Sequence, residues 1–73
     1  MITSEITHKT YEPSQCVYLS NPIQTQRYLE YLGSEHLVDI LWNSEIRKDA
    51  LIFVWRRCAE TKRAKELWDN HEL

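Results

Sequence analysis

The chain contains little glycine, proline or cysteine. Its 73 residues include one glycine, two prolines and two cysteines, with 42% hydrophobic and 27% charged residues. This composition is typical of a folded domain and argues against a disordered or low-complexity chain. Cys16 and Cys58 are too few and too far apart in the sequence for a disulfide framework, so we expect two free thiols.

Signals for membranes and secretion are also missing. No apolar run approaches the roughly 18 residues of a membrane span. The first residues, Met1 to Glu5, contain neither a basic segment nor the apolar segment of a secretory signal. We therefore expect a soluble protein of the reducing cytoplasm, without a membrane partner.

Motifs of catalysis and of ligand binding are absent as well. The candidate soft metal ligands, besides the cysteines, are His8, His36 and His71, and none of them forms a short C-x₂-C or H-x₃-H pair. Local spacing suggests no His–Cys or His–Ser pair, so nucleophilic catalysis has no support. The sequence predicts no metal, no cofactor, no small-molecule substrate and no catalytic residue, and hence a protein that is not an enzyme.

The longest unbroken apolar run extends from Ala50 to Trp55. Its β-branched and aromatic residues favour a central strand that is covered on both faces. We expect this strand to be extended, shielded from water and flanked by two other strands.

One helix has clear start and stop signals. Asn21 is a good N-cap, Pro22 suits the first helical position, and Gln24 can complete a capping box. Gly33 supplies the positive φ that ends many helices. The spacing predicts a helix over Pro22 to Leu32.

The whole pattern predicts an α+β domain of β-α-β-β-α order. The expected fold is a three-stranded, mainly antiparallel sheet of the split βαβ kind, with two helices on one face and the other face partly bare. Residues 1–13 are an arm or an edge strand, and residues 14–73 form one domain. The expected elements are strands at 16–20, 37–42 and 50–56, a polar turn at 43–49, and helices at 22–32 and from Glu60 or Thr61 onward.

The strand at 37–42 carries an unexpected carboxylate. Strict alternation places Val38, Ile40 and Trp42 on one face, and Leu37, Asp39 and Leu41 on the other. We interpret Asp39 as a charge that discourages edge-to-edge pairing of an outer strand. A contact with Arg56 or another basic residue across the sheet is the alternative.

These elements resemble a family of very small proteins of unknown function from Firmicutes bacteria, their phages and mobile elements. The resemblance covers residues 16–70 and is carried by Ser20-Asn21-Pro22, Tyr28-Leu29, Leu32-Gly33, Leu51-Ile52-Phe53-Val54-Trp55 and Leu67-Trp68. It implies the same β-α-β-β-α order and brings no catalytic residues. Small phage-type proteins frequently act by binding a host component, so the resemblance implies a binding role.

Charge is unevenly distributed along the chain. The net charge is −2, yet residues 46–65 hold a basic block. This block suits either a solvated surface or contact with phosphate or an acidic protein. The residues that would contact nucleic acid are Arg47, Lys48, Arg56, Arg57, Lys62, Arg63 and Lys65.

The favoured function is a non-enzymatic protein-interaction module that acts as a homodimer or on a host protein. Tryptophan and arginine side by side are common anchors of protein interfaces. The candidate partner-binding residues are Trp55, Arg56, Arg57 and Arg63. A nucleic-acid-binding protein is the alternative. For Cys58, beside two arginines, we expect a structural role and keep a reactive thiol as the alternative.

Overall fold

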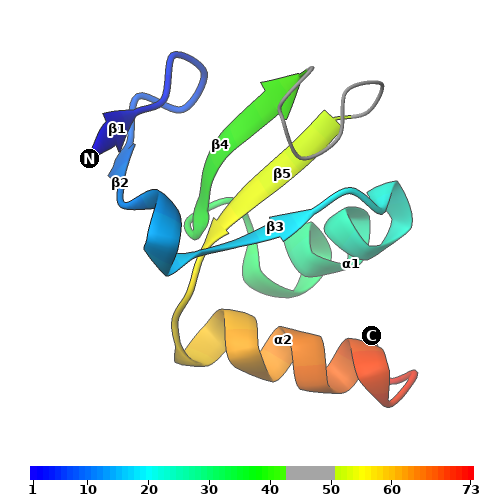
Figure 1. Ribbon diagram of the computed structural model, residues 1–73. Coiled ribbons are helices and arrows are strands. Elements are labelled where there is room, and N and C mark those ends of the chain that lie inside the picture. The colour runs from blue at the N-terminus through cyan, green and yellow to red at the C-terminus, as the bar shows by residue number, and fades with distance from the viewer. Residues whose placement is uncertain (43–50) are drawn as a thin grey trace.

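Three antiparallel strands and two helices form the body of the molecule (Figure 1). The structure is a computed structural model that describes residues 1–42 and 51–73. The elements are β1 (Ile2–Thr3), β2 (Thr10–Tyr11), a 3₁₀ turn (Pro13–Gln15), β3 (Cys16–Leu19), α1 (Pro22–Leu32), β4 (Leu37–Trp42), β5 (Leu51–Arg56) and α2 (Ala59–Asp69). The predicted α+β class and the three-stranded antiparallel sheet are confirmed. The predicted polar turn lies outside the described residues.

Strand β5 is the central strand of the sheet, as its apolar sequence predicts. The strand order is β3-β5-β4, and both pairings are antiparallel. Val54 and Trp55 are fully buried, and Ile52 is 1% exposed. A strand with covered faces on both sides and paired neighbours at both edges explains why this segment carries no polar side chain between Leu51 and Trp55.

Helix α1 begins and ends where its capping signals predict. The Asn21 Oδ1 atom accepts hydrogen bonds from the backbone N–H groups of Ile23 at 2.9 Å and Gln24 at 3.3 Å. Gly33 follows the helix with a φ of 71°. The Gln24 side chain donates to the Tyr28 hydroxyl at 3.2 Å, so it braces the next helical turn.

Both helices cover one face of the sheet (Figure 1). The core on this side is built on Tyr28 of α1, Leu37 of β4, Trp55 of β5 and Ala64 of α2. The rings of Tyr28 and Trp55 meet edge to face, with centroids 5.6 Å apart. Burial of large aromatic groups supplies much of the stability of so small a domain.

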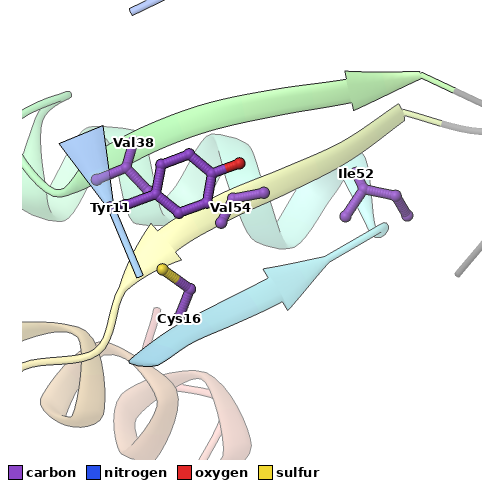
Figure 2. Packing of buried hydrophobic residues seen from close by; sticks show 5 residues of the cluster. All are labelled: Tyr11, Cys16, Val38, Ile52 and Val54. Atoms are coloured by element: carbon purple, nitrogen blue, oxygen red, sulfur yellow. The ribbon is translucent and has the colours of Figure 1, made fainter. Parts of the chain in front are cut away.

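The second face of the sheet is covered by the N-terminal segment. Strands β1 and β2 pair with each other in a two-stranded ladder of their own. Tyr11 of β2 belongs to one buried cluster with Cys16, Val38, Ile52 and Val54, and its ring lies over Val38 and Val54 (Figure 2). The expectation of a partly bare second face was therefore wrong, because the N-terminal segment folds back over it as a second layer. Of the two expected forms of residues 1–13, this segment is an arm and not an edge strand of the three-stranded sheet.

Asp39 fastens this second layer to the sheet. The side chain is 6% exposed, and its carboxylate accepts hydrogen bonds from the Ser4 hydroxyl at 2.6 Å and the Tyr11 hydroxyl at 2.5 Å. It also accepts from the Ile40 backbone N–H at 2.8 Å. Burial, together with this hydrogen bond to Asp39, raises the pKa of Tyr11. Asp39 is therefore neither a solvated edge charge nor a partner of Arg56, because three internal donors satisfy it.

Strand β4 departs from strict alternation at its start. The pairing with β5 shifts between Leu37 and Asp39. Leu37, before the shift, and Ile40, beyond it, pack on the helix side, whereas Val38 and Leu41 pack on the N-terminal side. The predicted grouping of Val38 with Ile40, and of Leu37 with Leu41, was wrong because a bulge inserts one extra residue and reverses the faces beyond it.

Candidate functional site

Trp55 lies in the core and not on the surface. Its side chain is 0% exposed and is packed against Tyr28 between the sheet and the helices. The predicted contact of Trp55 with a partner was wrong, because a central strand buries alternate side chains beneath the helices. Its role is to stabilise the fold.

The predicted arginines are exposed but do not line one surface. Arg56 and Arg57 line a hollow beside the N-terminal segment. The Arg57 guanidinium donates to the Cys16 carbonyl oxygen at 3.4 Å. Arg63 lines a different hollow and forms an ion pair with Glu66 at 3.3 Å. The role of these three arginines in partner binding stays a prediction.

Part of the predicted basic set gathers between β3 and α2. Arg57, Lys62 and Lys65 line one hollow of about 300 Å³, together with Val17. The Lys65 ammonium is also paired with Asp69 at 2.7 Å, and that hydrogen bond raises the pKa of Lys65. Arg47 and Lys48 lie outside the described residues. The fold thus brings together three of the seven predicted cations.

An apolar surface lies along the outer edge of β4. Its residues are Ile2 and Ile6 of the N-terminal segment and Trp42 of β4, and we call it the β4-edge surface. They line a hollow of about 310 Å³. Ile6 is 58% exposed and Trp42 61% exposed, and Leu51, which is paired with Trp42, is 44% exposed. Thr3 and Glu5 line the same hollow and give it a polar border.

The first half of β4 is protected at its outer edge. The Thr7 hydroxyl donates to the Val38 carbonyl oxygen at 2.6 Å. The Lys9 ammonium donates to the carbonyl oxygens of Ser34, Glu35 and Leu37 at 2.9 to 3.0 Å. These side chains occupy the strand edge that would otherwise pair with another chain. The β4-edge surface begins beyond this protected part.

A second cluster joins the start of β4 to the start of α2. The Cys58 Sγ atom lies 3.7 Å from His36 Nδ1. These atoms and a carboxylate oxygen of Glu60 all lie within 4.8 Å of one another. A hydrogen bond from its own backbone N–H and one from Cys58 lower the pKa of Glu60. The three donor types are those of a site for a borderline-soft cation.

The sequence search missed this cluster because its members are distant along the chain. Cys58 and His36 are 22 residues apart, and no short motif contains both. The predicted hairpin nevertheless indicates that His36 and Cys58 can lie close together, because antiparallel pairing places the start of one strand beside the end of the other. Leu37 pairs with Trp55, and the Arg56 N–H donates to the His36 carbonyl oxygen at 2.8 Å.

Comparisons with protein-family models, with curated proteins and with solved structures return no match. The resemblance noted over residues 16–70, and the phage or mobile-element origin that it implies, therefore stay predictions. In the described parts of the chain, neither helix is long and apolar enough to cross a bilayer. The cytoplasmic location likewise stays a prediction.

Proposed function

We propose that the protein is a non-enzymatic protein-interaction module whose β4-edge surface packs against a second copy of the chain. A host protein is the alternative occupant of the same surface. The observation that carries this proposal is the exposure of Ile6 and Trp42, 58% and 61%, beside Ile2 in one hollow. Large apolar side chains gathered on a small domain mark an interaction surface more often than scattered ones do.

The composition of this surface suits a protein partner. Burial of apolar area stabilises association by about 25 cal/mol per Å², and tryptophan is enriched at the centres of interfaces. Thr3 and Glu5 border the hollow, in keeping with the polar rim of protein interfaces. A twofold dimer places the same patch of both chains in contact, so one such surface is sufficient for association.

Self-association also fits the size of the chain. A domain of 73 residues has a thin stability margin, because it buries only about 60% of the surface of its unfolded chain. Small domains often add stability by oligomerisation. A dimer would cover the exposed apolar groups that the fold leaves at one edge.

Sedimentation equilibrium of an Ile6→Ser variant tests this proposal. We expect the wild-type protein to show a concentration-dependent mass that approaches twice that of one chain. We expect the variant to weaken the association about tenfold or more, since loss of a largely buried isoleucine at an interface costs about 1–3 kcal/mol.

The matched control is Ile23→Ser, which removes an isoleucine of similar exposure, 61%, from helix α1. Ile23 does not line the hollow at β4. We expect this control to associate like the wild type. A mass of one chain at all concentrations, or equal weakening by both variants, would contradict the homodimer.

Nucleic-acid binding is the second candidate function, because Arg57, Lys62 and Lys65 line one hollow. Such a cluster can contact phosphates, although the net charge of −2 opposes binding at a distance. In fluorescence anisotropy at about 50 mM salt, this function predicts binding that weakens steeply as salt is added.

Two variants that each remove one charge test whether the hollow lined by Arg57, Lys62 and Lys65 binds the nucleic acid. We expect Lys62→Gln to weaken binding, whereas Arg27→Gln on α1 leaves binding unchanged. Arg27 is exposed and paired with Glu30 at 3.1 Å, away from the lining of the hollow. Absence of binding to single- and double-stranded oligonucleotides at low salt would eliminate this function.

A further inference from the structure

We propose that His36, Cys58 and Glu60 form a binding site for a divalent cation of the zinc class. The three side chains supply a ring nitrogen, a thiolate sulfur and a carboxylate oxygen. These ligand types are the ones that bind zinc in proteins. None of the three residues lines the hollow of the β4-edge surface, so this proposal is independent of the proposed function.

The distance between the sulfur and nitrogen donor atoms matches that between two ligands of a tetrahedral centre. With bonds of about 2.3 Å to sulfur and about 2.0 Å to nitrogen, two tetrahedral ligands lie about 3.6 Å apart. The observed distance from Cys58 Sγ to His36 Nδ1 is 3.7 Å. The Glu60 carboxylate lies within 4.8 Å of both, and its exposed side chain has room to close the last part of that distance.

Hydrogen bonds hold His36 and Cys58 in place. The His36 carbonyl oxygen accepts from the Arg56 N–H at 2.8 Å, which ties the start of β4 to the end of β5. The Cys58 N–H donates to the Thr61 hydroxyl at 2.9 Å. The same hydroxyl lies 3.6 Å from Cys58 Sγ and provides an outer-shell contact for the sulfur. A site that is largely formed before binding loses little conformational entropy when the ion arrives.

Cysteine is a poor choice for the position that Cys58 occupies. Cys58 is the N-cap of α2, where serine, threonine, aspartate and asparagine are strongly preferred because their oxygens accept hydrogen bonds well. Sulfur is a weak acceptor. Helix capping therefore favours a side chain with an oxygen acceptor at position 58. Binding of a borderline-soft cation, by contrast, favours a thiolate there.

The site leaves one coordination position toward solvent. His36 and Glu60 line an open hollow of about 590 Å³ together with Tyr31, Leu32, Glu35, Ala59 and Arg63. Three protein ligands and a solvent molecule complete a tetrahedron. Thiolate and imidazole donors disfavour Mg²⁺ and Ca²⁺, which prefer oxygen ligands alone.

Binding is coupled to the release of a proton. The Cys58 thiol gives up its S–H proton to solvent as the sulfur–metal bond forms, and no electron is transferred. The charge of the thiolate and that of the Glu60 carboxylate together balance a divalent ion. Affinity should therefore rise as the pH is raised, because protons compete with the metal for sulfur.

Titration of the full chain with Co²⁺, followed by competition with Zn²⁺, tests the site. We expect a sulfur-to-cobalt charge-transfer absorption in the near ultraviolet and visible d–d bands of tetrahedral intensity, saturating at one ion per chain. Addition of Zn²⁺ should abolish both. The thermal midpoint of unfolding should rise with the concentration of Zn²⁺, because the ion binds only the folded state tightly.

The Cys58→Ser variant separates metal binding from folding. Serine caps the helix at least as well as cysteine, so we expect the metal-free variant to be as stable as the wild type. We expect its affinity for Zn²⁺ to fall by more than about 100-fold, because loss of an outer-shell partner alone costs about 10–100-fold. His36→Gln should weaken binding similarly, and Glu60→Gln by about tenfold.

His71→Gln and Cys16→Ser are the matched controls, since they remove a histidine and a cysteine that lie outside the cluster. Both should keep the cobalt spectrum of the wild type. The proposal is overturned if no charge-transfer band appears at stoichiometric Co²⁺, or if the band survives in Cys58→Ser. It is also overturned if the control variants lose binding to the same extent.

Discussion

At the scale of single residues, Asp39 has the largest structural influence that sequence reasoning did not assign. Its buried carboxylate accepts from Ser4, Tyr11 and the Ile40 backbone. A carboxylate with this many donors is stable away from water, although an unpaired one would be costly. The residue joins two segments that are 35 positions apart in the chain.

Removal of this carboxylate should destabilise the protein. We expect Asp39→Ala to lower the free energy of unfolding by about 2–4 kcal/mol, because the Ser4 and Tyr11 hydroxyls lose their acceptor in a buried place. Urea denaturation measures the change. Asp69→Ala is the control, since it removes an exposed ion pair with Lys65 and should cost under about 1 kcal/mol. Equal costs for both variants would contradict the role given to Asp39.

At the scale of elements, the N-terminal segment is a cover for the sheet. Its Tyr11 packs on Cys16, which is 5% exposed. Burial raises the pKa of the Cys16 thiol, although Arg56 and Arg57 oppose the increase. Cys58, by contrast, is only partly buried. The two thiols therefore report on different parts of the fold.

This difference predicts two rates of thiol modification. In metal-free buffer at neutral pH, we expect one thiol, Cys58, to react quickly with a disulfide reagent and Cys16 to react much more slowly. Asp39→Ala should increase the rate at Cys16 about tenfold or more, because it loosens the cover, and leave the rate at Cys58 unchanged. Peptide mapping of the labelled chain identifies the sites. Fast labelling of Cys16 in the wild type would contradict the role of the N-terminal segment in shielding this thiol from solvent.

Elements were predictable where their signals are local. Asn21, Pro22 and Gly33 mark both ends of α1, and the apolar run at Leu51 to Trp55 identifies the central strand. The cover over the second face was not predictable, because it depends on a long-range contact at Asp39. The bulge at the start of β4 has no local signature either, and it reversed the expected faces of that strand.

Candidate sites were less predictable than elements. The basic block is visible in the sequence, yet Arg57 and Arg63 line different hollows. The order Trp-Arg-Arg suggested an interface anchor, but a central strand buries its tryptophan. The apolar β4-edge surface and the cluster at Cys58 arise only when segments from different parts of the chain meet.

At the scale of the whole molecule, a small sheet is covered on both faces and leaves apolar groups at one edge. The helices bury Trp55, and the N-terminal segment buries Val38 and Val54. Ile6 and Trp42 remain exposed beside β4. We propose that this edge is a protein-binding surface that the chain uses to pair with itself.

The most direct test is site-specific photo-crosslinking of the purified protein. A benzophenone amino acid replaces Ile6 in one sample and Ile23 in another, two positions of similar exposure, 58% and 61%. We expect a covalent dimer from position 6 and almost none from position 23, with the product increasing with protein concentration. A failure of position 6 to give dimer, or equal yields from both positions, would contradict this proposal.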